Sequence, residues 1–368
     1  MNPGLDLVRG ICAITVMIAH TEYWLDRALD LDRTYLMRPV GFMAVEFFFV
    51  LSGMLLGPIM LKALERLPRI NLRVFVIRRA FRTLPLYFLA LAAYAVLDTG
   101  AGREQIATYA FFSQNLVTSM PPFFSVSWSL SVEEWYYLAA PFMLAASLAL
   151  LPNATNLERF RWCMLLLVVT AFVLRLVYVS DYSDWDQDIR KVVVLRVDAI
   201  ALGALLGSCA IQVDARRAWV AAGALSTIAL GLGLSWTALN AHRDVPSVGI
   251  ALSLLFTVIP VCIFFVIRWS ELRFKTRFRR AERFFADISY PLYLFHIPVL
   301  VVFASHFGDS SLIALAAYYA ISVLLAYALH LTIERSFMSR RPQFASETAP
   351  AGPAPGDGRL SRSARPGP

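Results

Sequence analysis

The sequence predicts an all-α protein, a polytopic transmembrane helical bundle of about ten spans with both termini on the cytoplasmic side. Three observations support this fold class. Of the 368 residues, 58% are hydrophobic and only 16% are charged, whereas soluble domains are about 25% charged. Many apolar stretches reach about 20 residues, the length that spans a bilayer. The net charge of +8 is concentrated in short loops, which indicates membrane topology and anionic headgroups rather than nucleic acid.

Ten apolar stretches are long enough to be expected as spanning helices. They are 5–25, 39–61, 78–97, 127–151, 161–180, 191–212, 217–238, 247–268, 286–304 and 311–334. A shorter stretch, 106–118, is expected to be re-entrant or interfacial on the outer side. We assign 1–335 to one transmembrane domain. Residues 345–368 are rich in Pro, Gly, Ala and Ser, which predicts a disordered cytoplasmic tail.

The charges of three loops predict the orientation. The segments 62–82 and 268–283 each contain seven Lys and Arg residues, whereas 181–188 contains four Asp and no basic residue. Basic loops favour the cytoplasm. All three loops follow this rule if 106–118 does not span, and both termini then lie inside. The first apolar stretch has no short basic leader, so no cleavable signal peptide is expected.

Ionisable residues inside the apolar stretches are the candidate catalytic groups, because charge within a bilayer is costly and marks function. At 1.5 Å per residue, His20, Glu46, Glu133 and Glu134 reach a similar depth near the outer side, from three different helices. An imidazole beside a carboxylate suits general base catalysis. The sequence therefore predicts a reaction centre in this layer.

These residues also have structural interpretations, which the sequence leaves open. Glu46 lies beside a phenylalanine run, and pairing with Arg175 or Arg196 would give it a purely structural role. One of the adjacent Glu133 and Glu134 must point away from the helix face that carries the reaction centre, so only one of them is expected to take part in the chemistry. Membrane histidines are also often packed core residues.

Arginines gather near the inner ends of two predicted spans. Arg78 and Arg82 share a helix face, Arg79 lies between them, and Arg9 lies at a similar depth. Guanidinium groups match the geometry of phosphate oxygens. The cluster is therefore a candidate phosphate site, and positive-inside anchoring is the alternative.

Five motifs occur together in a fixed order. They are Arg9 followed after ten residues by His20, then FFFVLSG, IRRAFRTLP, SWSLSVEEWYYL and SYPLYLFH. In this order and spacing, 1–335 resembles the integral-membrane acyltransferase-3 family of bacterial O-acyltransferases. The resemblance implies a multi-pass protein of the bacterial inner membrane. It also implies transfer of an acyl group, usually acetyl, from cytoplasmic acyl-CoA to a hydroxyl of lipopolysaccharide or another polysaccharide outside.

The resemblance implies a role for each site residue. The catalytic group comprises His20, Glu46, Glu133 and Glu134, with His20 as general base or acyl carrier and a Glu of the pair orienting it. The residues implied to hold acyl-CoA are Arg9, Arg78, Arg79 and Arg82. The residues implied to support the substrate or the oxyanion are Ser52, Ser129, Tyr290 and His296. The family commonly has Asp where this chain has Glu46.

The remaining expectations concern ligands and partners. The lipid bilayer, acyl-CoA and a glycan are expected partners, and Trp185 with its neighbouring Asp residues is a candidate sugar contact or a solvated acidic loop. No metal site is expected, because no Cys/His cluster has ligand spacing. Some family members carry a fused SGNH-type hydrolase domain, for which this chain is too short, so a separate periplasmic partner is the alternative to a single-domain enzyme. The alternative functions are that of a small-molecule acyltransferase acting on macrolides and that of a proton-coupled transporter.

Overall fold

The computed structural model is helical throughout most of the residues that it describes. These residues are 3–29, 37–65, 68–97, 104–178, 184–209, 214–241, 245–274, 279–307 and 311–345, and within them no strand occurs. The tail predicted at 345–368 lies outside them, except for Ala345. Parts of the loops 62–82, 181–188 and 268–283 also lie outside.

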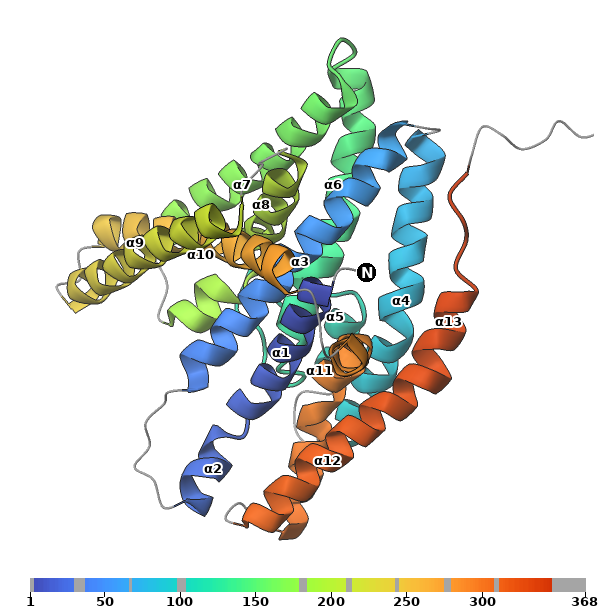
Figure 1. Ribbon diagram of the computed structural model, residues 1–368, viewed down its shortest axis with the longest axis vertical. Helices are drawn as coiled ribbons and strands as arrows, with labels where there is room; N and C mark the ends of the chain where they lie inside the picture. The colour runs from blue at the N-terminus through green and yellow to red at the C-terminus, as the bar shows by residue number, and fades with distance from the viewer. Residues whose placement is uncertain are drawn as a thin grey trace, which may run out of the picture.

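The helices fall into long and short elements. The long helices are α1 (Pro3–Ala19), α3 (Met37–Glu65), α4 (Pro68–Leu97), α6 (Ser127–Leu150), α7 (Asn156–Tyr178), α9 (Ala215–Ala241), α10 (Val245–Arg273), α11 (Arg279–Phe307) and α12 (Leu312–Leu329). The short helices are α2 (Glu22–Ala28), α5 (Ile106–Ala110), η2 (Asp186–Arg190), η3 (Val193–Leu195), α8 (Val197–Ser208), η4 (His330–Glu334) and α13 (Arg335–Ser339). Helices α9 and α10 lie side by side and project from the rest of the bundle (Figure 1).

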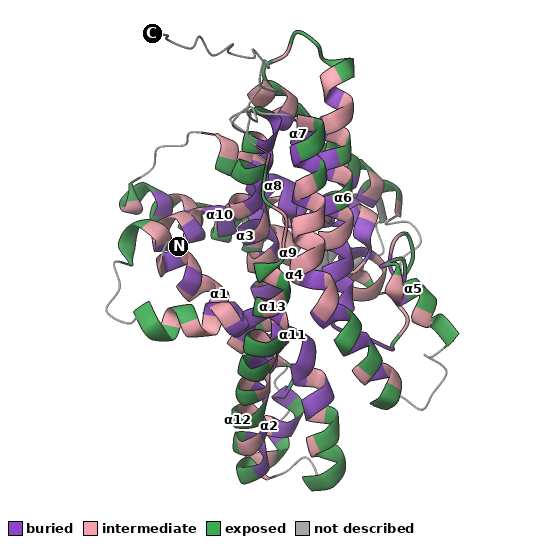
Figure 2. Ribbon diagram, turned by 90° about the vertical axis from the view of Figure 1, so that its right-hand side faces the viewer, coloured by how far each residue is buried: buried purple, intermediate pink, exposed green. Residues whose placement is uncertain are grey.

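Six helices of the described chain are long and apolar enough to cross a membrane. They are α3 from Pro39, α4, α7, α10 from Val248, α11, and the continuous helix from α12 to Ser339. The bent pair of α1 and α2 makes a seventh if it is one span. Buried residues concentrate in the bundle centre, and α12 has a largely exposed face (Figure 2), which carries Ile313 and Leu324. Exposed apolar faces of this kind are typical of contact with lipid, and the chain is a multi-pass membrane protein.

The first predicted span is broken at its outer end. Helices α1 and α2 are bent by 60° at His20 and Thr21. The Thr21 hydroxyl donates to the Ile18 carbonyl over 2.8 Å, and Nδ1 of His20 lies 2.8 Å from the Val16 carbonyl. Side chains that bond to nearby carbonyls compete with the regular helix. The prediction of one helix over 5–25 was therefore wrong, and His20 lies at the break.

The predicted helix over 191–212 was also wrong. Helix α8 has 12 residues, about 18 Å at 1.5 Å per residue, against a core of about 30 Å. The chain before it forms short turns, because the amides of Val193 and Val194 donate to the carbonyls of Asn115 and Leu116. Those acceptors belong to the 106–118 stretch, which forms only α5 and irregular backbone. This confirms that 106–118 contains no spanning helix.

Helices α3 and α8 pack backbone to backbone through two glycines. A Cβ at Gly53 would lie 2.0 Å from the Ile200 carbonyl oxygen, and a Cβ at Gly203 would lie 2.3 Å from that of Val50. Small residues allow such close approach between membrane helices. The glycine of the FFFVLSG motif is therefore explained by packing.

We expect Gly203→Ala to separate α3 from α8 and to destabilise the protein by about 1–3 kcal/mol or more, as overpacking generally does. The thermal unfolding temperature of the purified protein in detergent measures the effect. Gly223→Ala on α9 is the matched control, because a Cβ there meets nothing within 4 Å. Equal unfolding temperatures for the two variants would contradict the proposed packing.

Candidate active site

Two cavities lie on either side of a shared wall. The first, of about 300 Å³, is lined by five arginines and is called the arginine cavity. The second, of about 900 Å³, contains His20 and is called the histidine cavity. Val45 on α3 and Tyr293 on α11 line both cavities. A ligand bound in one cavity is therefore separated from the other by these two side chains.

The arginine cavity contains all four arginines of the predicted phosphate site. Arg78, Arg79 and Arg82 lie within little more than one turn of α4, and Arg9 comes from α1. Arg341, which follows α13, also lines the cavity and was not predicted. A cluster of guanidinium groups in a partly enclosed site is suited to binding phosphates.

Glu133 belongs to the arginine cavity. Its two carboxylate oxygens accept hydrogen bonds from the Ser52 hydroxyl, over 2.9 Å, and from the Tyr137 hydroxyl, over 3.0 Å. The Arg79 guanidinium lies 4.4 Å from the centre of the Tyr137 ring and interacts electrostatically with Glu133 and Glu134. Glu133 thus helps to hold Arg79, with Ser52 fixed beside it.

The other predicted support residues are bound into the walls. Ser129 and Tyr290 line the arginine cavity. The Ser129 hydroxyl lies 2.6 Å from that of Tyr293, and the Tyr290 hydroxyl donates to the Thr83 carbonyl over 2.8 Å. Glu134 is not among the described residues that line either cavity. These bonds fix the walls around Tyr293.

The partner of His20 is a second histidine. Nδ1 of His20 lies 3.2 Å from Nε2 of His296 on α11, and also 2.8 Å from the Val16 carbonyl oxygen. Nδ1 of His296 lies 3.1 Å from the Leu292 carbonyl oxygen. Because carbonyl oxygens only accept, both imidazoles carry their hydrogen on Nδ1 when neutral. The His20 Nδ1–H is then shared between Val16 and the lone pair of His296 Nε2.

This tautomer leaves the Nε2 lone pair of His20 available as a base. His20 is exposed on the wall of the histidine cavity, whereas His296 is 1% exposed. The expected pairing of His20 with Glu133 or Glu134 does not occur. The carboxylate of Glu133 is held by Ser52 and Tyr137, and His296 occupies the position beside the His20 ring.

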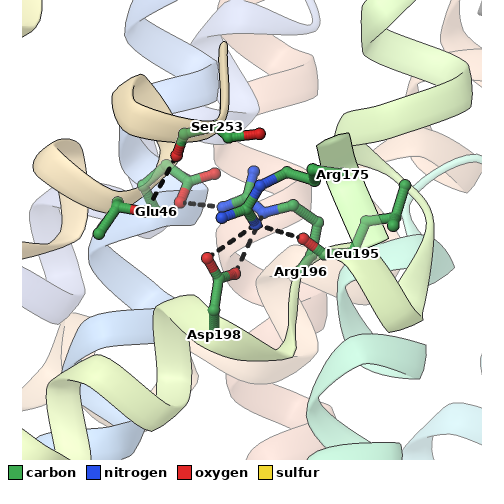
Figure 3. Close-up of polar contacts among 7 residues, drawn as sticks. Glu46, Arg175, Leu195, Arg196, Asp198 and Ser253 are labelled. Carbon is green, nitrogen blue, oxygen red and sulfur yellow. Dashed lines mark hydrogen bonds and ion pairs between the residues drawn. The ribbon is translucent and has the colours of Figure 1, made fainter. Parts of the chain in front are cut away.

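Glu46 lies in a separate cluster of buried charges (Figure 3). Its carboxylate accepts from Arg196 over 2.6 Å, and Arg175 pairs with Asp198 over 2.7 Å. Arg175 also donates to the Leu195 carbonyl over 2.6 Å. The four charged side chains are at most 1% exposed.

The charge cluster joins three helices. It contains two guanidinium groups and two carboxylates from α3, α7 and the start of α8, so its charges balance. The Arg196 guanidinium also lies 4.1 Å from the centre of the Phe256 ring on α10. Of the two interpretations of Glu46, the ion pair with Arg196 is confirmed. Glu46 is not among the described residues that line either cavity, because this pair directs its side chain toward the start of α8.

The histidine cavity has an aromatic and polar lining. Trp185, Asp184 and Asp186 line it, together with Arg190 and Lys191. Burial alone would raise the pKa of Asp186, but the charges of Arg190 and Lys191 outweigh it and hold that pKa below its usual range. Asp186 pairs with Lys191 over 2.8 Å. The acidic segment is therefore partly neutralised and lies on the cavity wall.

Sequence reasoning missed several residues of these walls, among them Tyr293, Arg341 and Phe344. Tyr293 lies three residues after Tyr290 and three before His296, so helical spacing within SYPLYLFH places Tyr293 beside each of them. Arg341 and Phe344 follow the last apolar stretch, where no pattern indicates contact with the site.

One family model matches most of this chain, whereas the curated relatives match less than half of it. The model of the family described as "Acyltransferase domain" matches residues 2–331. "Putative peptidoglycan O-acetyltransferase YrhL" of Bacillus subtilis (strain 168) is 26% identical over 195 residues, which are 48% of this chain and 28% of YrhL. "Peptidoglycan O-acetyltransferase OatA" of Listeria monocytogenes is 26% identical over 169 residues, 41% of this chain and 25% of OatA. The chain thus matches about a quarter of the length of these curated relatives. No solved structure matches it.

Proposed function

The chain belongs to the acyltransferase-3 family, and we propose that it is a membrane O-acetyltransferase that transfers acetyl from cytoplasmic acetyl-CoA to a hydroxyl of a cell-envelope polysaccharide. One observation carries the proposal: an arginine-lined cavity and a histidine-lined cavity share the wall formed by Val45 and Tyr293. Such an arrangement suits a reaction whose two substrates arrive from opposite sides.

The arginine cavity is assigned to the donor. Coenzyme A carries a pyrophosphate and a 3′-phosphate, which are the chemical partners of Arg9, Arg78, Arg79 and Arg82. The uncharged pantetheine arm would then extend past Tyr293. This extension brings the thioester to His20.

The histidine cavity is assigned to the acceptor. Its volume of about 900 Å³ suits a segment of glycan, and binding sites commonly combine apolar walls with a few polar groups. Trp185 can stack on a sugar ring, and Asp184 can accept from its hydroxyls. The names of YrhL and OatA specify peptidoglycan, so peptidoglycan sugars are the first acceptors to examine.

The histidine pair supplies the proton transfers. Nε2 of His20 takes the proton of the acceptor hydroxyl while its oxygen attacks the thioester carbonyl carbon. The carbon–sulfur bond breaks, and the proton passes from His20 to the departing thiolate, which yields CoA thiol and the O-acyl ester. His296 stabilises the transient His20 cation, because its Nε2 lone pair accepts from the His20 Nδ1–H.

The proposal includes the topology. Helices α6 and α9, of 24 and 27 residues, are long enough to span, and α8 with 191–196 forms a further, irregular crossing. Irregular backbone is tolerated within a membrane when protein surrounds it, and Asp198 to Ala204 are all buried. Ten crossings in the bacterial inner membrane then place both termini and the arginine cavity on the cytoplasmic side.

The test is release of CoA thiol by the purified protein in liposomes supplied with acetyl-CoA. We expect release that depends on an added peptidoglycan fragment or polysaccharide. If thiol is released only with a macrolide-type hydroxyl, the acceptor is a small molecule and not a glycan. No release with any acceptor, from folded protein that moves a solute in exchange for protons, would favour a transporter.

A further inference from the structure

The chain continues past α13 and returns to the mouth of the arginine cavity. Residues 341–345, called the strap, run alongside α4 (Figure 1). The side chain of Asn71 donates to the Ala345 carbonyl over 3.2 Å and accepts from the Ala345 amide over 2.9 Å. Nη1 of Arg78 donates to the Pro342 carbonyl over 2.6 Å. The strap is therefore bonded to a residue of the cavity itself.

Two strap side chains form part of the cavity lining. Arg341 and Phe344 line it, and the Arg78 guanidinium lies 4.9 Å from the centre of the Phe344 ring. Burial and the charges of Arg78 and Arg79 lower the pKa of Arg341. Repulsion of this kind is relieved when an anion binds between the guanidinium groups.

The charge balance of the cavity indicates a polyanionic ligand. Five arginines line it in the described chain, and Glu133 is the only carboxylate among the same lining residues. The carboxylate already accepts from Ser52 and Tyr137. Arginines left without carboxylate partners are typical of phosphate sites.

We propose that the strap is part of the donor site: Arg341 binds a phosphate group of acyl-CoA, and Phe344 and Arg78 hold the strap over the bound nucleotide. The inference rests on the proposed function and extends it to a residue beyond the family match at 2–331. Because Arg78 bonds to the strap and lines the cavity, donor binding and strap position are coupled.

The experiment compares the affinity of CoA for wild type, Arg341→Ala and Arg341→Lys by calorimetry on full-length protein in detergent. We expect Arg341→Ala to weaken CoA binding about tenfold, as loss of one charge-assisted hydrogen bond does. Arg341→Lys should lie between, because it keeps the charge and loses the fork. Arg340→Ala is the matched control, since Arg340 is exposed and outside the cavity lining, and it should bind within about twofold of wild type.

Pantetheine, which lacks phosphates, separates this role from a general disturbance of the site. It should bind equally to wild type and Arg341→Ala. Equal CoA affinity for wild type and a folded Arg341→Ala would overturn the role of the strap and leave the proposed function standing. Wild-type protein that binds no CoA at all would overturn both.

Discussion

Replacing His20 by Asn is expected to lower acyl transfer by about 10²–10⁴-fold, the usual contribution of a general base, while CoA binding is unchanged. Asn keeps an N–H donor near the position of Nδ1, where His20 lies 2.8 Å from the Val16 carbonyl oxygen, but it has no basic nitrogen. The local bend between α1 and α2 is therefore preserved and the proton acceptor is removed. Acceptor-dependent thiol release measures the rate.

His306→Asn is the matched control for His20→Asn. His306 is exposed near the end of α11, where its Nδ1 also lies 2.8 Å from a carbonyl oxygen four residues earlier. This variant should transfer at the wild-type rate. A His20→Asn rate within about threefold of wild type would exclude His20 as general base.

Replacing Glu46 by Gln is expected to destabilise the protein by about 3–5 kcal/mol, the cost of breaking a buried ion pair by removing one partner. Gln keeps the shape of the side chain but leaves the charge cluster with two guanidinium groups and one carboxylate. Of the two carboxylates in the cluster, Asp198, 3.9 Å away, then remains near Arg196, which is fully buried. The thermal unfolding temperature in detergent measures the change.

Two further variants distinguish the ion pair from other effects. Glu65→Gln, at the exposed end of the same helix, should unfold at the wild-type temperature. Glu46→Met combined with Arg196→Met should recover most of the loss, because apolar pairs often replace buried ion pairs at little cost. If Glu46→Gln unfolds like Glu65→Gln, the cluster does not hold α3 to α8.

The sequence predicts the helices well wherever apolar length alone decides them. Helix α3 (Met37–Glu65) contains the whole of the expected 39–61 and extends it by two residues at one end and four at the other. Prediction fails where polar contacts between distant segments override apolar length. The 191–212 stretch is broken because the backbone amides of Val193 and Val194 donate to the irregular backbone after α5. No local sequence pattern predicts these long-range hydrogen bonds.

The sequence predicts which residues belong to the candidate site better than it predicts which of them form pairs. Arg78, Arg79 and Arg82 lie within little more than one helical turn, so the sequence alone predicts that they are close together. The depth estimate could not decide which partner His20 meets, so it joined His20 to Glu133 or Glu134 instead of His296. Which carboxylate meets which base depends on helix rotation and packing, and those are set by distant contacts such as that of Ser52 with Glu133.

The most direct test of the central claim is the sidedness of transfer in sealed vesicles. Protein is reconstituted in both orientations, with labelled acetyl-CoA outside and an impermeant polysaccharide either enclosed or outside. The two-cavity account predicts label on the enclosed polysaccharide, lowered at least about 100-fold by His20→Asn, and none when donor and acceptor share one side. Equal labelling of polysaccharide on the donor side would contradict it, because both substrates would then enter from one face.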